Sequence, residues 1–244
     1  MRAGNRLPGW EKRLIDSLFR LVTLTEGREG AKKEERPKFV GYQDLLKLLA
    51  NPECPACIIV RRSLKGFVSM AFIEELTVPE FREPLRAARG YCREHSAYMR
   101  EGAKNWLRKM GVAIVLEDLL ALVQEQMRTK ETVPPVGDCP LCRLEKDIDA
   151  YAVKLIADYC QDSEFQQHYD SSTGVCLPHL RKLLQVLDGE GRRFMIVAHE
   201  RKLDVTLGHL REFIRKHDYR FAHEKITPEE AESWKNAVEF VVGR

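Results

Sequence analysis

Two short motifs, each written twice, constrain this chain more than any other feature of its sequence. CPAC at 54–57 is repeated as CPLC at 139–142, and GYCREH at 90–95 is repeated as GVCLPH at 174–179. The CPxC motifs are 85 residues apart and the GxCxxH motifs 84, so the copies differ by a one-residue deletion between the motifs. Repetition over this length indicates duplication of a whole supersecondary unit.

The repeated residues have the composition of a metal site. Each copy holds three cysteines and one histidine, and three thiolates with one imidazole complete a tetrahedral set for zinc. Cys-x-x-Cys lets two sulfurs converge in a turn, and Cys-x-x-His puts two side chains on one side of a helix's first turn. Gly90 and Gly174 provide backbone freedom at the bend before the third cysteine. We therefore predict two zinc ions, held by Cys54, Cys57, Cys92, His95, Cys139, Cys142, Cys176 and His179.

The motifs leave two questions open. The simplest pairing puts one complete set in each copy, but Cys54 and Cys57 could instead share a metal with Cys176 and His179. An iron–sulfur cluster is the rival to zinc, because thiolates serve both. Neither CPxC motif is followed by the histidine that a c-type haem needs, and the βαβ setting of a redox Cys-x-x-Cys is missing. Four filled positions leave no place for a catalytic water, so we expect structural metals.

Cysteine usage and the chain's N-terminus indicate a reducing compartment. Six of the seven cysteines fall in the motifs beside histidines, a pattern that favours metal over disulfides. Cys160 stands apart on a helical stretch and is predicted to be a buried structural thiol. No signal-peptide core and no membrane-length apolar run is present, so we expect a cytoplasmic protein with no membrane partner.

Hydrophobic periodicity predicts an all-α fold: a duplicated helical module, each copy pinned by a Cys3His site, with further helices at both ends. A last helix is expected after Thr227, with Thr227 as its N-cap and a capping box to Glu230. The other helices are expected at about 9–24, 41–51, 56–77, 92–101, 110–129, 141–161, 176–188 and 193–217. We divide the chain into an N-terminal helix and charged loop (1–39), a first module (40–133) and a second module (134–244), the two modules packing as one pseudo-symmetric unit.

The net charge and the motifs of the sequence give little support for catalysis or nucleic-acid binding. The formal net charge is +3, with the basic excess in residues 1–130, which is weaker than in a dedicated nucleic-acid binder. No phosphate-binding glycine loop, nucleophile elbow or His-Glu-x-x-His occurs, so an enzyme is not favoured. His199, His209 and His217 are predicted to be ordinary surface or capped histidines.

The doubled CPxC and GxCxxH layout, followed by HDYRF and by TPEEAESWKNAVEFVVG, resembles an uncharacterised family of bacterial cytoplasmic proteins. The resemblance covers roughly residues 40–243. It implies that all eight cysteine and histidine ligands carry over, and it implies no activity.

The sequence favours a zinc-stabilised helical binding or adaptor protein, with an unknown protein partner or self-association. The first alternative is an iron–sulfur redox or sensor protein that uses the same ligands. The second is a nucleic-acid-binding regulator that uses the more basic N-terminal half.

Overall fold

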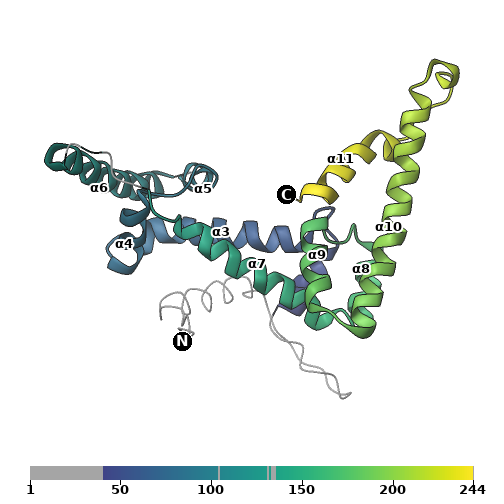
Figure 1. The fold of residues 1–244 in the computed structure, drawn as a ribbon, viewed down its shortest axis with the longest axis horizontal. Helices are drawn as coiled ribbons and strands as arrows, with labels where there is room; N and C mark the ends of the chain where they lie inside the picture. Colours follow the sequence, from purple (N-terminus) through teal and green to yellow (C-terminus); the bar gives the residue numbers. More distant parts are fainter. Residues whose placement is uncertain (1–40, 104, 131, 133–135, 244) are drawn as a thin grey trace. The chain divides into compact units, whose positions relative to one another are not determined.

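The computed structural model describes residues 41–103, 105–130, 132 and 136–243. The predicted N-terminal helix and charged loop of residues 1–39 lie outside the described residues. Within the described part the fold is all-helical, as predicted, and contains no strand (Figure 1). The α-helices are α2 (Tyr42–Leu49), α3 (Pro55–Glu74), α4 (Pro79–Ala88), α5 (Ser96–Gly102), α6 (Trp106–Lys130), α7 (Pro140–Tyr159), α8 (Ser163–Ser171), α9 (Leu177–Val186), α10 (Gly189–Lys216) and α11 (Pro228–Val242), with a 3-10 helix η1 (Tyr219–Phe221) after α10.

The described chain divides into two compact units. Unit 1 comprises the described residues of Val60–Ile148, and unit 2 comprises 41–59 and 149–243. The division differs from the boundary between residues 133 and 134 that the repeat suggested, because it falls inside the two long helices. Helix α3 begins in unit 2 and ends in unit 1, and α7 begins in unit 1 and ends in unit 2. The two units are therefore not the two copies of the repeat.

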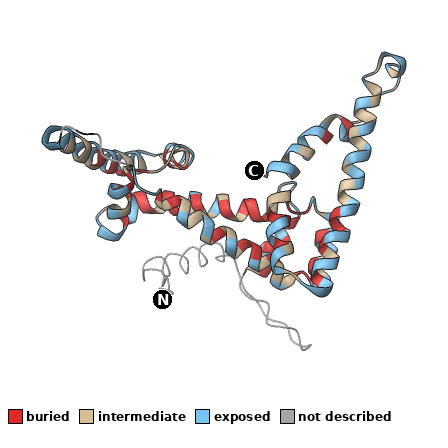
Figure 2. Ribbon diagram, viewed as in Figure 1, coloured by how far each residue is buried: buried red, intermediate tan, exposed pale blue. Residues whose placement is uncertain are grey.

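Unit 2 is built around a core from α2, α7, α8, α9 and α10, in which Phe165, Tyr169 and Met195 have no exposed surface (Figure 2). Asp162 caps α8 by accepting a hydrogen bond from the Phe165 amide at 2.9 Å, and it also accepts one from the Tyr42 hydroxyl of α2. This pairing joins the first described helix to the second half of the repeat.

Unit 1 packs α4 and α6 against the C-terminal part of α3. The rings of Phe72 and Phe81 meet edge to face with their centroids 6.0 Å apart. Helix α6 crosses close to α3 at Gly111, where a Cβ atom would collide with the carbonyl oxygen of Phe72. Arg82 and Arg86 of α4 both pair with Asp118 of α6, at 2.9 and 3.2 Å.

The C-terminal helix begins as the sequence predicted. Thr227 is the N-cap of α11, and its hydroxyl accepts a hydrogen bond from the Glu230 amide, while the Glu230 carboxylate accepts one from the Thr227 amide. Glu230 also pairs with Lys216 at 2.6 Å, and both side chains are at most 10% exposed. This ion pair fixes the start of α11 against the end of α10.

Candidate metal centres

The structure gathers all eight predicted ligands into two clusters. Each cluster joins the CPxC motif of one copy to the Cys-x-x-His of the other, and the four ligand atoms lie within 4.8 Å of one another. The unit-2 cluster is Cys54, Cys57, Cys176 and His179, and the unit-1 cluster is Cys92, His95, Cys139 and Cys142. A complete set within each copy, the simpler pairing, is therefore wrong, and the crosswise alternative is the observed one.

Helix lengths favour pairing between the copies over closure within one copy. Helix α3 starts beside Cys57 and has 20 residues, so it carries the chain about 30 Å away from that motif. Helix α4 has 10 residues and is only about 15 Å long, half the length of α3. Helices α7 and α8, with 20 and 9 residues, repeat the mismatch in the second copy. Each CPxC motif pairs instead with the Cys-x-x-His of the other copy.

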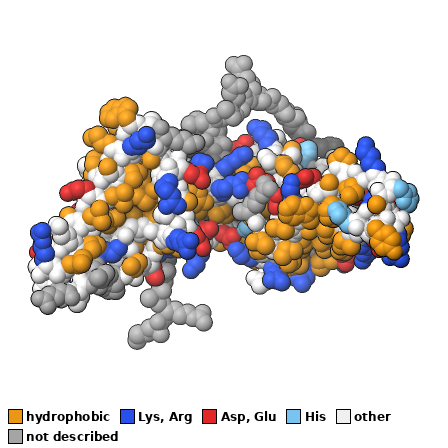
Figure 3. Space-filling view, turned by 90° about the horizontal axis from the view of Figure 1, so that it is seen from above, with side chains coloured by type: hydrophobic (Ala, Val, Ile, Leu, Met, Phe, Trp, Pro, Cys, Tyr) orange, Lys and Arg blue, Asp and Glu red, His pale blue; other side chains and the backbone are white. Residues whose placement is uncertain are grey.

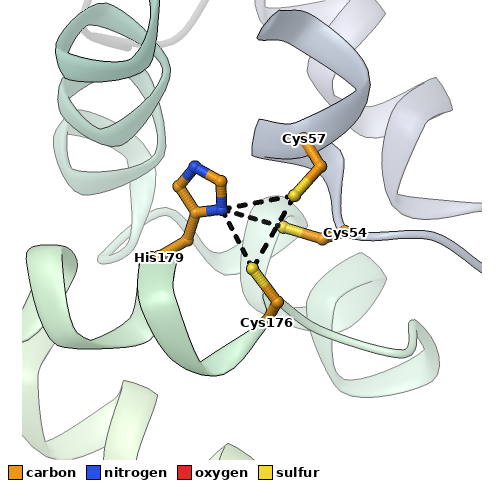
Figure 4. Close-up of side chains that lie close together, drawn as sticks. All are labelled: Cys54, Cys57, Cys176 and His179. Atoms are coloured by element: carbon orange, nitrogen blue, oxygen red, sulfur yellow. Dashed lines mark hydrogen bonds between the residues drawn. The ribbon is translucent and has the colours of Figure 1, made fainter. Parts of the chain in front are cut away.

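Figure 4 shows the four side chains of the unit-2 cluster pointing toward one another, from the start of α3 and the start of α9. The Nδ1 atom of His179 lies 3.5 Å from the sulfurs of Cys54 and Cys57 and 3.0 Å from that of Cys176. The Cys57 and Cys176 sulfurs are 3.7 Å apart, far beyond a disulfide bond, and both cysteines are free.

The unit-1 cluster has nearly the same dimensions. Nδ1 of His95 lies 3.3 Å from the Cys92 sulfur, 3.6 Å from that of Cys139 and 3.4 Å from that of Cys142. The sulfurs of Cys92 and Cys142 are 3.9 Å apart. Two independent sets of residues therefore converge on one geometry.

These spacings fit one tetrahedral ion. Zinc–sulfur bonds of about 2.3 Å and a zinc–nitrogen bond of about 2.05 Å place sulfurs about 3.8 Å apart, and sulfur and nitrogen about 3.6 Å apart. The observed sulfur–sulfur distances are 3.7 and 3.9 Å, and the sulfur–nitrogen distances run from 3.0 to 3.6 Å. A multinuclear iron–sulfur cluster would put the ligands on different irons and hold them farther apart. The donor set fits a single ion in each cluster.

Helix starts bring the cysteines into place. Pro55 and Pro140 occupy the first positions of α3 and α7, where a missing amide proton costs nothing. Cys176 is the N-cap of α9, and its carbonyl accepts the first helical hydrogen bond from Leu180. The partial positive charge at these N-termini favours thiolates over thiols. Gly174 has φ +80° and Gly90 φ +105°, as the predicted bends required. In the first copy a turn at 93–95 precedes α5, which begins after His95 and not at Cys92.

The histidine of each cluster has a carboxylate on the side away from the sulfurs. Nε2 of His179 lies 2.8 Å from Asp149, and Nε2 of His95 lies 3.3 Å from Glu145. A carboxylate in this position fixes the tautomer that presents Nδ1 to a metal and makes the imidazole a stronger ligand. Lys182 holds the other oxygen of Asp149 at 2.6 Å. No repeat pattern marks these two carboxylates, because at a shift of 85 residues Glu145 and Asp149 align with the apolar Val60 and Leu64.

The pKa values of groups in and beside the clusters show how a bound cation would change their protonation. Desolvation and the neighbouring thiols of Cys92 and Cys139 raise the pKa of Cys142 to about 12. Burial opposes the ionised form of Asp149, but hydrogen bonds from His179 and Lys182 outweigh it and lower its pKa. The raised pKa keeps the proton on the Cys142 thiol, and a divalent cation removes that penalty by displacing the proton.

The two clusters differ in how they are covered. In the unit-2 cluster three of the four residues are buried and Cys54 is half-buried, whereas in the unit-1 cluster only His95 and Cys139 are buried. Gly243, at the end of α11, lies over the unit-2 sulfurs. A Cβ atom there would come within 3.1 Å of the Cys176 sulfur and 3.3 Å of that of Cys57, and φ is +80°. The glycine thus lets the C-terminal backbone close over the cluster.

A buried histidine orders the loop that carries Cys176. His199 is 2% exposed, so its prediction as an ordinary surface or capped histidine is wrong. Its Nδ1 lies 2.8 Å from the Met195 carbonyl oxygen, and its Nε2 lies 3.2 Å from the Tyr169 hydroxyl. That hydroxyl in turn accepts a hydrogen bond from the Val175 amide at 3.2 Å. Burial lowers the pKa of His199, in keeping with a neutral ring that accepts from Tyr169.

The remaining residues singled out in the sequence lie away from the clusters. Cys160 is 1% exposed, and burial raises its thiol pKa, which confirms a buried structural thiol. His217 is exposed, with Nδ1 2.7 Å from the Phe213 carbonyl oxygen, and His209 is half-buried. Neither is a ligand of the two clusters.

A cleft of about 380 Å³ opens beside the unit-2 cluster, between α10, α11 and the loop before α9. Cys54 and Cys176 form part of its wall, and Lys202 lies on another side. The Lys202 ammonium donates to the carbonyl oxygens of Tyr169 and Ser172, at 2.8 and 2.7 Å. The lysine therefore braces the turn that leads to Cys176.

Among the described residues, no helix combines the length and the apolar character needed to cross a membrane.

Comparison with known proteins identifies no activity. Residues 135–244 match the model of a family of unknown function, DUF6062. The match is shorter than the resemblance over residues 40–243 that the motifs suggested, and it holds two ligands of each cluster: Cys139, Cys142, Cys176 and His179. Neither the search of curated proteins nor that of solved structures found a match. The segment similar to this family thus contains half of each cluster and no complete metal site.

Proposed function

We propose that this chain is a helical binding or adaptor protein whose two Cys3His clusters each bind one structural zinc ion. The observation that carries the proposal is the donor geometry: in both clusters three sulfurs and one Nδ1 stand at the spacings of a single tetrahedral ion. The carboxylate behind each imidazole supports the same assignment.

A structural role follows from the number of ligands. Three thiolates and an imidazole fill all four zinc positions, so no site is left for a water or a substrate. A bound zinc ion would cross-link helix starts that are distant in the chain, and would thereby stabilise a small helical unit. In the unit-2 cluster the joined residues are up to 125 positions apart, and in the unit-1 cluster up to 50.

A binding role is supported by large apolar side chains left at the surface. On α6 they include Trp106, which is 73% exposed, and Leu120, which is 68% exposed. On α11, Trp234 and Val238 are about half exposed. Exposed apolar stripes on helices are typical of surfaces that receive another helix or a partner.

Metal analysis of the purified protein tests the zinc assignment. We expect two zinc ions per chain and a colourless protein after purification without oxygen. Iron with acid-labile sulfide and a brown colour would refute it and favour the iron–sulfur alternative. Replacing zinc with cobalt(II) gives a second measurement, because a tetrahedral thiolate site turns cobalt intensely blue-green.

A further inference from the structure

Helix α6 is apolar on two opposite faces. One face is buried within unit 1 and presents Gly111, Val115 and Leu119. The other is exposed, and Figure 3 shows hydrophobic side chains gathered at the surface over this part of the chain, at the left of the view. A helix that is apolar all round normally has both faces covered.

The exposed face has the spacing of a helix-pairing seam. The residues of this seam recur in alternating steps of four and three, the pattern of positions a and d in a heptad. They are residues 106, 110, 113, 117, 120, 124 and 127. Every large apolar side chain of α6 that is exposed falls on this seam or directly beside it. They are Trp106, Leu107, Met110, Ile114, Leu116, Leu120 and Met127, with exposed fractions from 37 to 73%. The inner face uses the remaining heptad positions.

The chain contains a segment that fits this seam. Between residues 10 and 22, outside the described part, Trp10, Leu14, Leu18 and Leu21 recur every three or four residues. A helix over 10–22 would present about 18 Å of apolar stripe, and the seam from Trp106 to Leu120 extends about 21 Å. An isolated helix of this length is marginal in water, so it needs an apolar surface.

Charge favours this segment over a second copy of α6. Glu117 is the middle residue of the seam. Two copies of α6 paired in register, either parallel or antiparallel about the centre, would put Glu117 against its own counterpart, and like charges there disfavour pairing. The 10–22 segment offers Arg13 and Arg20 at the edge of its apolar stripe. A tether also raises the local concentration of the segment around the rest of the chain.

We propose that the exposed seam of α6 is the docking surface for this chain's own N-terminal segment, residues 10–22, bound as an amphipathic helix. The proposal goes beyond the metal sites, because no ligand of either cluster takes part in it.

Photo-crosslinking of the full-length, metal-loaded chain tests the proposal. A photoreactive phenylalanine analogue at position 120 lies on the seam, and the same analogue at position 129, an exposed position on another side of α6, is the control. We expect position 120 to cross-link to residues 10–22 and position 129 not to. A mixture of unlabelled and nitrogen-15-labelled chains shows whether the two peptides come from one molecule. Cross-links between two copies of α6, or none to 10–22, would overturn the proposal.

Iodide quenching of Trp106 fluorescence provides an independent measurement. In a Trp10→Phe/Trp234→Phe background, Trp106 is the remaining tryptophan. Leu18→Asp places a charge on the apolar stripe and is expected to raise the quenching constant of Trp106. Thr23→Asp adds the same charge one residue beyond the segment and outside its apolar stripe, and should leave the constant unchanged. Equal quenching in both variants and the parent would contradict docking.

Discussion

Crosswise pairing of the half-sites makes a prediction that separates it from pairing within copies. The double variant Cys54→Ser/Cys176→Ser removes two ligands from the unit-2 cluster and leaves the unit-1 cluster complete. The double variant Cys54→Ser/Cys92→Ser removes one ligand from each cluster. Both variants lose two thiols, so any difference between them reports which residues share a metal.

The expected difference is large. We expect the first variant to retain one zinc ion per chain and the second to retain none tightly. Structural zinc contributes about 10 kcal/mol or more to folding in favourable cases, and a whole domain is stable by only about 5–15 kcal/mol. The first variant should therefore keep unit 1 folded and lose order around the start of α3, while the second should lose order around both clusters.

Zinc content after gel filtration, measured by mass spectrometry of the metal, is the primary assay. Circular dichroism during thermal unfolding follows the helices of the surviving unit. Cys160→Ala is the matched control, because this thiol belongs to neither cluster and should leave two zinc ions bound. One zinc in Cys54→Ser/Cys92→Ser and none in Cys54→Ser/Cys176→Ser would refute the observed pairing.

Three further changes test how the clusters are supported. Asp149→Asn weakens the hydrogen bond to the imidazole of His179, and we expect zinc affinity of the unit-2 cluster to fall about 10- to 100-fold in a chelator competition. Gly243→Ala forces a Cβ atom against two sulfurs at a positive φ, so zinc should leave this cluster faster, with release from the unit-1 cluster as the internal control. Tyr169→Phe leaves the Val175 amide and Nε2 of His199 without their shared partner, and should lower the free energy of unfolding by about 1–3 kcal/mol in urea titrations.

The sequence was sufficient for the fold class and for the eight residues that gather in the two clusters, because both depend on local patterns. The start of α11 is one example, since Thr227, Pro228 and Glu230 define a capping box within four residues. The eight ligands are another, because their spacing is set by turns and by the first turn of a helix. Both kinds of feature are decided by neighbours in the chain, which a sequence displays directly.

Which half-sites pair depends on the length and rigidity of α3 and α7. The spacing between the motifs in the sequence does not reveal either property. The long helix predicted after Cys57 already implied a displacement of about 30 Å, but α4, which follows it, was not predicted from the sequence. Asp149 could not have been found this way. Its contact with His179 is set by how α7 packs on α9, and its aligned position in the first copy is Leu64, which is fully buried.

The second copy has polar groups where the first has apolar ones. Tyr169 and His199 align, at a shift of 84 residues, with Leu85 and Val115, which are 2% and 3% exposed. In unit 1 the corresponding space is filled by aliphatic packing, and in unit 2 by a hydrogen-bond network that ends on the Val175 amide. His199 therefore lacked a counterpart in the repeat, and nothing in its immediate sequence marked it as buried.

The crosswise pairing also orders the assembly of the two clusters. Closing the unit-2 cluster joins Cys57 to Cys176 across 119 residues, and closing the unit-1 cluster joins Cys92 to Cys142 across 50. Loop-closure entropy makes the longer connection costlier by about 0.8 kcal/mol, from (3/2)RT times the logarithm of the length ratio. The unit-2 cluster also needs α11 in place before Gly243 covers its sulfurs. Refolding with zinc should therefore fill the more exposed unit-1 cluster first, and the deeply covered cluster should close last and release its metal last.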